Sequence, residues 1–172
     1  MNGVTRDSPP GPAVVLANGL YRSPFAKTTH GLVRGPSRWP VAAVVDAACA
    51  GADAGELLDG RRRGIPIVAS LADALGGPGP RPRVCVVGVA TAGGVLPPAL
   101  RADLLAAADA GLDLVNGLHH LLADEPELAA LARERGARIF DIRRPRPTSE
   151  LRFWSGQVLS LTTPRIAVLG TD

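Results

Sequence analysis

The sequence predicts an α/β fold of the Rossmann-like, doubly wound kind, with a mainly parallel sheet and helices on both faces. Short apolar runs rich in Val, Ile and Ala recur along the 172 residues, and most end in a Gly, Asn or Asp turn signal. Uniformly apolar runs of this kind are typical of strands buried on both faces of a parallel sheet. Helical segments alternate with the runs, as they do in doubly wound domains. The hydrophobic fraction of 46% allows a sizeable core.

Seven apolar runs are the expected strands. The third contains Pro66, which has no N–H to donate to a strand ladder, so we expect a short strand at a sheet edge there. The runs cover Ala13–Ala17, Val41–Val45, Ile65–Ala69, Val84–Val89, Leu112–Val115, Arg138–Ile142 and Ile166–Leu169.

Proline and glycine mark the ends of the expected helices. Ser23-Pro24 supplies a cap and a first-position proline for a helix that continues to Arg34. Pro97-Pro98 opens a second helix, which Gly111 closes. The remaining helices are expected at Glu125–Arg135 and, as shorter segments, at Ala54–Leu58 and Ser70–Leu75.

The pattern divides the chain into four parts. We expect a disordered leader over residues 1–12, the Rossmann-like domain over 13–142 and an extended connector over 143–164. Prolines at positions 145 and 147 exclude a helix interior from the connector. A last strand follows within residues 165–172 and ends in a Gly-Thr-Asp turn. This strand is either an ordinary edge strand or the first strand of a second domain that is cut short.

Composition and charge argue against several classes of protein. The net charge of +3 arises from Arg interspersed with acids, and aromatic residues make up only 3%, a poor match to nucleic-acid binding. Cys49 and Cys85 form no zinc or disulfide pattern, so we expect no metal. Because we find no apolar signal segment and no run long enough to span a bilayer, we expect no membrane association and a cytoplasmic location.

Polar residues that could carry chemistry lie where strands end, the edge at which open α/β sheets bind ligands. The first turn holds Asn18 and leads through Arg22 and Ser23 to Lys27, the only lysine. Backbone amides at a helix start together with two cations favour a carboxylate or a phosphate. The alternative is an ordinary capped helix with surface charges.

The turn after the fourth run is rich in glycine. Thr91, Gly93 and Gly94 lie in it, and their backbone amides could form an anion-binding concavity. The alternative is a flexible loop before the helix that starts at Pro98.

The fifth and sixth turns offer a base and a cation. Asn116 precedes His119 and His120, and we prefer His119 as general base or hydrogen-bond donor, against the alternative of a surface pair. Arg143 follows Asp141 and could bind a carboxylate in bidentate fashion or make a connector salt bridge.

Several of these segments together resemble one family. Residues 16–32, with the sequence LANGLYRSPFAKTTHGL, resemble the opening of the D-glutamate N-acetyltransferase family. Gly88–Pro98, Asn116–His119, Asp141–Arg143 and Val168–Asp172 also resemble it, in the expected order. The resemblance spans residues 13–172.

The resemblance implies a Rossmann-like domain followed by a P-loop NTPase-like domain. Gly170, Thr171 and Asp172 would begin the P-loop and contribute to an anion or cofactor site, but the Lys and the Ser/Thr of that motif are absent. This departure puts binding of phosphate or acetyl-coenzyme A through the loop in doubt. We therefore expect this chain to be a truncated part of its parent and inactive alone.

For the parent protein, the resemblance implies acetyl transfer from acetyl-coenzyme A to the amine of D-glutamate, in D-amino-acid catabolism. Side-chain chemistry then suggests roles for the residues singled out above. Arg22, Lys27 and Arg143 would bind carboxylate or phosphate, with Asn18 and Asn116 beside the substrate. His119 would be the base or donor, and Ser23 with the Thr91–Gly94 amides would hold an anion.

The expected partners are a small acidic metabolite, the missing P-loop domain and further copies in a homo-oligomer. The alternative function is a non-catalytic domain that binds a nucleotide or acidic metabolite, or serves as a scaffold. Its parent would then be a P-loop NTPase-like protein of the ATP-dependent ligase type.

Overall fold

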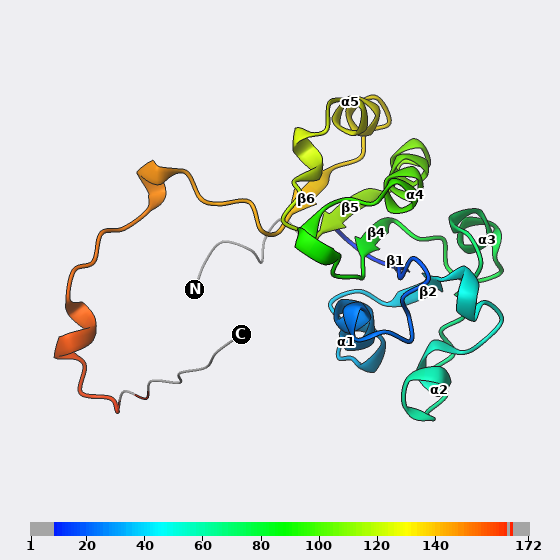
Figure 1. Cartoon of the computed structure of the whole chain (residues 1–172), viewed down its shortest axis with the longest axis horizontal. Helices are drawn as coiled ribbons and strands as arrows, with labels where there is room; N and C mark the ends of the chain where they lie inside the picture. Colours follow the sequence, from blue (N-terminus) through cyan, green and yellow to red (C-terminus); the bar gives the residue numbers. More distant parts are fainter. Residues whose placement is uncertain (1–8, 165, 167–172) are drawn as a thin grey trace.

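The computed structural model describes residues 9–164 and 166, and a six-stranded, all-parallel sheet forms their centre (Figure 1). The strand order is β3-β2-β1-β4-β5-β6, which confirms the predicted Rossmann-like, doubly wound fold. The strands are β1 (Ala13–Leu16), β2 (Val41–Val45), β3 (Ile67–Val68), β4 (Val84–Val87), β5 (Asp113–Asn116) and β6 (Ile139–Asp141).

Burial follows the apolar runs that predicted the strands. All residues of the central strands β1 and β4 are buried, because helices cover both faces of the sheet. β3 has only two residues and forms one edge, as the proline before it predicts. The opposite edge, β6, is half-buried throughout.

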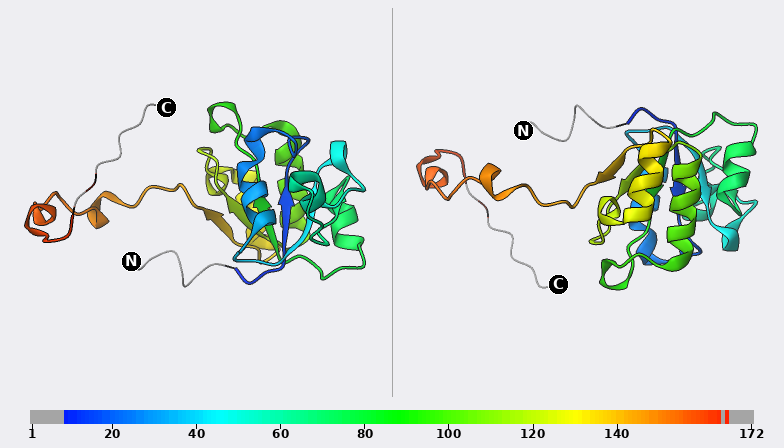
Figure 2. Two further views of the ribbon diagram at one scale, coloured as in Figure 1. Left: turned by 90° about the horizontal axis from the view of Figure 1, so that it is seen from below. Right: turned by 90° about the horizontal axis from the view of Figure 1, so that it is seen from above.

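The helices form two layers (Figure 2). On one face, α1 contacts α2, and on the other, α4 contacts both α3 and α5. Helices on both faces leave only the two edges of the sheet and its strand ends open to ligands. The helices are α1 (Lys27–Arg34), α2 (Ala54–Asp59), α3 (Leu71–Gly76), α4 (Pro98–Asp109) and α5 (Pro126–Glu134).

The first helix begins later than the sequence predicts. Ser23 does act as a cap, because its hydroxyl accepts a hydrogen bond from the Phe25 amide at 3.2 Å. What it caps is a single 3-10 turn, Pro24–Ala26, and the α-helix starts only at Lys27. Thr29 Oγ1 donates to the Gly88 carbonyl at 2.8 Å, which fixes the start of α1 beside the loop after β4.

The chain reverses its direction of travel across the sheet between β1 and β4. From β1 it proceeds to β2 and β3 on one side, and from β4 to β5 and β6 on the other. The loops that leave β1 and β4 therefore diverge at the carboxyl edge. In open α/β sheets this divergence produces the crevice in which ligands bind.

The fold begins before the end of the predicted leader. Pro9 is buried, and its carbonyl accepts a hydrogen bond from Trp39 Nε1 at 2.7 Å. The Pro12 carbonyl accepts from the Arg83 amide at 2.8 Å. Residues 9–12 are thus packed on the domain, and the prediction of disorder is wrong for them. Residues 1–8 lie outside the described residues.

Residues 143–164 run away from the body of the domain as an exposed arm with two 3-10 turns (Figures 1 and 2). Phe153 and Trp154 on this arm are 97% and 75% exposed. Of the predicted last strand only Ile166 is described, and Gly170, Thr171 and Asp172 lie outside the described residues. No helix in the described part of the chain is long and apolar enough to cross a membrane.

Candidate functional site

A cavity of about 470 Å³ lies at the carboxyl edge of β4, β5 and β6. Four segments that are distant in sequence build it: the start of α1, the loop after β4, the loop after β5 and the residue Arg143 beyond β6. It is lined by Thr28, Val87, Val89, Ala90, Thr91, Gly93, Gly94, Gly117, Leu118, His119 and Arg143.

The backbone passes through a narrow space at Gly88, at the end of β4. A Cβ atom there would overlap Thr29 Oγ1 and lie 2.5 Å from Val15 Cγ1. Only glycine fits at position 88, because Thr29 of α1 and Val15 of β1 approach its backbone closely. This close packing brings Thr28, the second residue of α1, to the cavity wall.

Two consecutive glycines shape the floor of the cavity. Gly93 and Gly94 have φ values of 65° and 66°, in the left-handed region. A Cβ at Gly94 would lie 2.7 Å from His119 Cδ2, so the imidazole packs directly on the Gly94 backbone. The Thr91 hydroxyl donates to the Val95 carbonyl, and the Thr91 carbonyl accepts from the Gly94 amide at 2.9 Å. Thr91 therefore stabilises this loop through two hydrogen bonds within it.

His119 and Arg143 meet at the cavity. Arg143 Nε donates to the Gly117 carbonyl at 2.7 Å, which holds the guanidinium over the loop after β5. Its Nη1 lies 3.4 Å from His119 Nε2, and because arginine can only donate, Nε2 is the acceptor of this contact. No carboxylate in the described part of the chain forms an ion pair with Arg143. The cavity thus has one cation without an acidic partner.

Asn116 and Asp141 hold the loop that carries His119. Asn116 is fully buried, and its amide nitrogen donates to the His120 carbonyl at 2.8 Å and to Asp141 Oδ1 at 2.7 Å. Its amide oxygen accepts from the Leu118 amide at 2.9 Å. Asp141 also accepts from the Leu122 and Ala123 amides at 2.9 and 3.0 Å. Asn116, a predicted substrate contact, is therefore occupied in positioning the loop.

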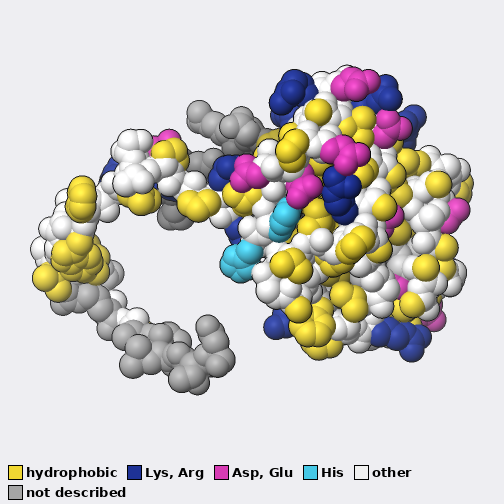
Figure 3. Space-filling model, turned by 45° about the horizontal axis from the view of Figure 1, so that its top comes forward, with side chains coloured by type: hydrophobic (Ala, Val, Ile, Leu, Met, Phe, Trp, Pro, Cys, Tyr) yellow, Lys and Arg dark blue, Asp and Glu magenta, His cyan; other side chains and the backbone are white. Residues whose placement is uncertain are grey.

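The two adjacent histidines have different surroundings. His120 Nε2 lies 2.8 Å from Glu125 Oε1, and Arg101 Nε donates to the other oxygen of that carboxylate at 3.3 Å. Hydrogen bonds from His120 and Arg101 lower the pKa of Glu125. Only His119 lines the cavity. Histidine side chains reach the surface among acidic side chains near the base of the arm (Figure 3).

The structure does not bring the first-turn residues to this cavity. Asn18, Arg22, Ser23 and Lys27 are absent from its lining, although the next residue, Thr28, belongs to it. Asn18 has a φ of 49° and forms the turn after β1. Sequence reasoning missed Thr28, Gly117 and Leu118. The signal available for Thr28 was its position one residue after the predicted cation Lys27, at the start of the same helix.

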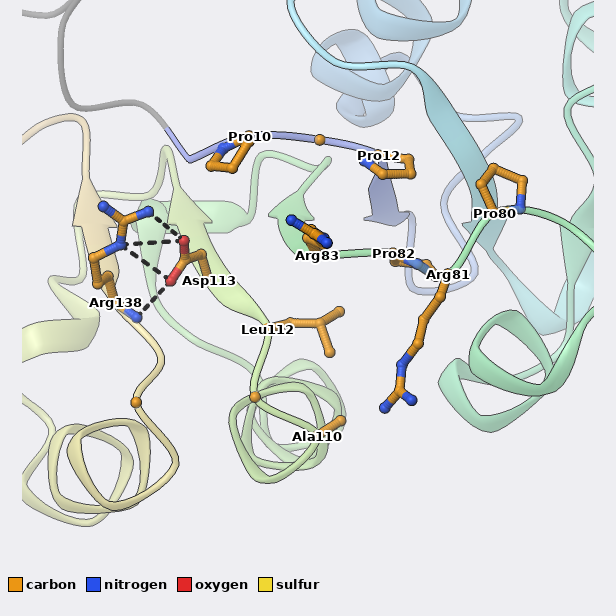
Figure 4. A pocket seen from close by; sticks show the side chains of 13 residues that line it. Pro10, Pro12, Pro80, Arg81, Pro82, Arg83, Ala110, Leu112, Asp113 and Arg138 are labelled. Atoms are coloured by element: carbon orange, nitrogen blue, oxygen red, sulfur yellow. Dashed lines mark hydrogen bonds and ion pairs between the residues drawn. The ribbon is translucent and has the colours of Figure 1, made fainter.

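A larger hollow of about 880 Å³ lies at the amino edge of the sheet (Figure 4). Its acid, Asp113, is paired with Arg138 at 2.7 Å. The carboxyl ends of α4 and α5 lie beside it at Ala110 and Gly136. Helix carboxyl ends carry partial negative charge, which disfavours an anionic ligand. Arg81 and Arg83 also line this hollow, but open α/β sheets bind their ligands at the opposite, carboxyl edge.

Within the described part of the chain, no group of three or more His, Cys, Asp or Glu side chains could hold a metal ion. The buried thiol of Cys85 has a raised pKa because burial disfavours the thiolate. It is a core residue of β4, not a nucleophile of the cavity.

Comparison with known proteins decides the family. The family described as "Domain of unknown function (DUF1611_N) Rossmann-like domain" matches residues 47–145. This chain belongs to that family. The matched segment includes the loops after β4 and β5 and Arg143, and hence most of the cavity.

Two relatives extend the comparison. A protein named D-glutamate N-acetyltransferase, from Tritonibacter scottomollicae, is 43% identical over 63 residues, which are 37% of this chain and 19% of that protein. The crystal structure of a DUF1611 family protein from Anabaena variabilis has 36% identity and a TM-score of 0.74, covering 87% of this chain and 41% of that one. The chain therefore spans less than half the length of these relatives.

Proposed function

We propose that this chain is the Rossmann-like domain of an N-acyltransferase that acetylates D-glutamate or a similar acidic amino acid with acetyl-coenzyme A. The partial relative named D-glutamate N-acetyltransferase supports the reaction class. The observation that carries the proposal is the guanidinium of Arg143, which lies on the cavity beside His119 without an acidic partner among the described residues. A parent with a further, P-loop NTPase-like domain completes the enzyme.

Acyl transfer to an amine needs three things from the protein. It must grip the acceptor's carboxylates, take up a proton from the amine as the new C–N bond forms and the thioester C–S bond breaks, and stabilise the oxyanion. Arg143 presents the planar donor fork that suits a carboxylate. His119 Nε2 lies 3.4 Å from Arg143 Nη1 as a hydrogen-bond acceptor, and it is the group proposed to take up the proton. The Gly94 amide already donates to the Thr91 carbonyl, so the backbone amide proposed to face an anion in this loop is that of Gly93.

The first-turn cations take a separate role in the proposal. Lys27 and Arg22 lie outside the cavity lining, next to Thr28 on the chain and before α1. Neither forms an ion pair with an acid in the described part of the chain. They are available to the second carboxylate of the acidic acceptor, together with the Ser23 turn.

The proposal is tested by assaying acetyl transfer to D-glutamate in the full-length parent. The Arg143→Gln variant should raise the Michaelis constant for D-glutamate at least about tenfold, since a hydrogen bond to a charged group contributes about 1.5–3 kcal/mol. His119→Gln should lower turnover by about 10²-fold or more. Arg144→Gln is the matched control, because Arg144 lies outside the cavity lining and pairs with Asp124 at 2.7 Å and, less closely, with Asp141 at 3.6 Å. No acetyl transfer by the unaltered parent would refute the proposal.

A second candidate is a domain that binds an acidic metabolite without chemistry of its own. It is favoured by the surroundings of His119, whose only side-chain hydrogen-bond partner in the described part of the chain is a cation. A general base is usually oriented by a carboxylate or a carbonyl. Full turnover in His119→Gln together with a raised Michaelis constant in Arg143→Gln would select this candidate.

A further inference from the structure

Rossmann-like domains that bind dinucleotides share a site on the β1 and β2 side of the carboxyl edge. A glycine-rich turn after β1 admits the phosphates, and an acidic side chain after β2 binds the ribose. In this chain Asp46 follows β2 directly, at the place of the ribose-binding acid. The turn after β1 instead contains Asn18, Leu20 and Tyr21.

Asp46 is not available to a ribose. It is 1% exposed, and both oxygens of its carboxylate accept backbone hydrogen bonds. Oδ2 accepts from the Tyr21 amide at 2.9 Å, and Oδ1 accepts from the Ala48 amide at 3.1 Å. The carboxylate therefore ties the turn after β1 to the turn after β2.

Tyr21 fills the space between the two turns that Asp46 connects. Its side chain is 1% exposed, and its hydroxyl donates to the Ala54 carbonyl at the start of α2. The Tyr21 carbonyl accepts from His30 Nε2 at 2.6 Å, and the two rings meet edge to face with centroids 5.4 Å apart. Burial, and secondarily Asp53, raise the pKa of Tyr21 to about 12. The phenol thus stays neutral and in place across the physiological pH range.

The cavity on the β4–β6 side of the carboxyl edge is small and carries little positive charge. The cavity of about 470 Å³ lies in the lower half of the range of about 300–1,000 Å³ that is usual for ligand sites. Arg143 is the cation that lines it. One guanidinium matches a carboxylate, whereas the several phosphates of a nucleotide-bearing acyl donor require more positive charge.

We infer that this domain binds the acidic amine acceptor alone, and that Tyr21 and Asp46 close its nucleotide groove. The acyl donor's nucleotide is then held by a different part of the parent. The inference rests on the proposed function for the identity of the two substrates. It assigns the carboxyl edge of β4–β6 to a small carboxylate ligand, such as D-glutamate.

Backbone NMR of this chain tests the inference residue by residue. D-glutamate should cause saturable shifts of the Gly93, Gly94 and Gly117 amides, and Arg143→Gln should weaken binding at least about tenfold. ADP, the probe for the donor's nucleotide, should leave the Tyr21 and Ala48 amides unshifted and should not displace D-glutamate. Arg144→Gln should bind D-glutamate as the unaltered chain does.

Two results would overturn the inference. Saturable ADP shifts at Tyr21 and Ala48 would show that the groove opens. Failure of D-glutamate to shift the cavity glycines would show that the acceptor site lies elsewhere. Either result leaves the proposed function standing if the full-length parent still acetylates D-glutamate, so the two failures are distinguishable.

Discussion

The two halves of the carboxyl edge use the same backbone arrangement in opposite ways. On the β1–β2 side, a tyrosine and an aspartate that are each 1% exposed fill and tie the crevice. On the β4–β6 side, Gly93, Gly94 and Gly117 leave a cavity, and Arg143 lines it. Side-chain volume at the turn positions thus distinguishes the two crevices, because Tyr21 fills one and Gly93 and Gly94 leave room in the other.

The comparison also separates polar groups that hold the fold from those that face a ligand. Side-chain oxygens of three residues accept hydrogen bonds from backbone amides: Asp46, Asn116 and Asp141. Arg143 donates through Nε to a backbone carbonyl, and its Nη1 lies near His119 at the cavity. Substitutions can therefore weaken the packing of the β1–β2 side without changing ligand binding on the β4–β6 side, and the reverse.

Tyr21→Ala should have the largest effect on stability. Removing a buried aromatic side chain costs about 3–5 kcal/mol of unfolding free energy, because the cavity left behind is only partly refilled. Urea denaturation measures this loss, and the affinity of the remaining folded protein for D-glutamate should be unchanged. Tyr21→Phe, the matched control, should cost only about 1 kcal/mol, for the lost hydrogen bond to the Ala54 carbonyl. Equal losses in both variants would contradict a space-filling role.

Gly94→Ala should distort the cavity on the β4–β6 side. The new Cβ would lie 2.7 Å from His119 Cδ2 at a φ of 66°, so we expect about 1–3 kcal/mol of destabilisation and weaker D-glutamate binding. Gly93→Ala carries the same backbone strain at a φ of 65°, but its Cβ meets only Val95 Cγ1, at 3.9 Å. The difference between the two variants isolates the contact with His119. Identical thermal unfolding and binding in both would argue against that contact.

Asp46→Asn should loosen the connection between the turn after β1 and the turn after β2. The amide keeps one acceptor oxygen for two backbone donors, so the tie between the two turns should weaken by about 1–2 kcal/mol. Hydrogen exchange at the Tyr21 and Ala48 amides reports the loosening directly. Unchanged protection of both amides would mean that Tyr21 closes the groove without help from the carboxylate.

The smallest expected effect is a pH dependence at Glu125. Its pKa is lowered by hydrogen bonds from His120 and Arg101, so this carboxylate adds stability above its ordinary pKa of 4.5. The contribution should be lost as the pH falls through the lowered folded-state value. Glu125→Gln should therefore make the acid side of the stability profile less steep, by well under about 1 kcal/mol for a partly exposed pair. An unaltered profile in urea titrations at several pH values would contradict this assignment.

Local chemistry predicted the strands and the fold class well. The run at Val84–Val89 is apolar at every position except Gly88, and such runs have few alternatives to a buried parallel strand. The start of α1 was predicted less well, because Ser23 caps a 3-10 turn that sequence signals do not distinguish from an α-helix. The packing of Pro9 depends on Trp39, a contact between residues 30 positions apart that no local pattern encodes.

The site was predictable in part. Strand-end reasoning identified Thr91, Gly93, Gly94, His119 and Arg143, all of which line one cavity. It could not show that Asn116 is turned inward to His120 and Asp141, since the exposure of an amide after a strand depends on tertiary packing. Nor could it separate Lys27 from Thr28, because neighbouring residues on a helix face different directions.

The most direct test of the central claim is a calorimetric titration of this chain with D-glutamate, in the unaltered form and as Arg143→Gln and Arg144→Gln. Our account predicts saturable binding that Arg143→Gln weakens at least about tenfold and that Arg144→Gln leaves unchanged. No saturable binding to the unaltered chain, or equal losses in the two variants, would contradict the claim that the open half of the carboxyl edge receives an acidic ligand.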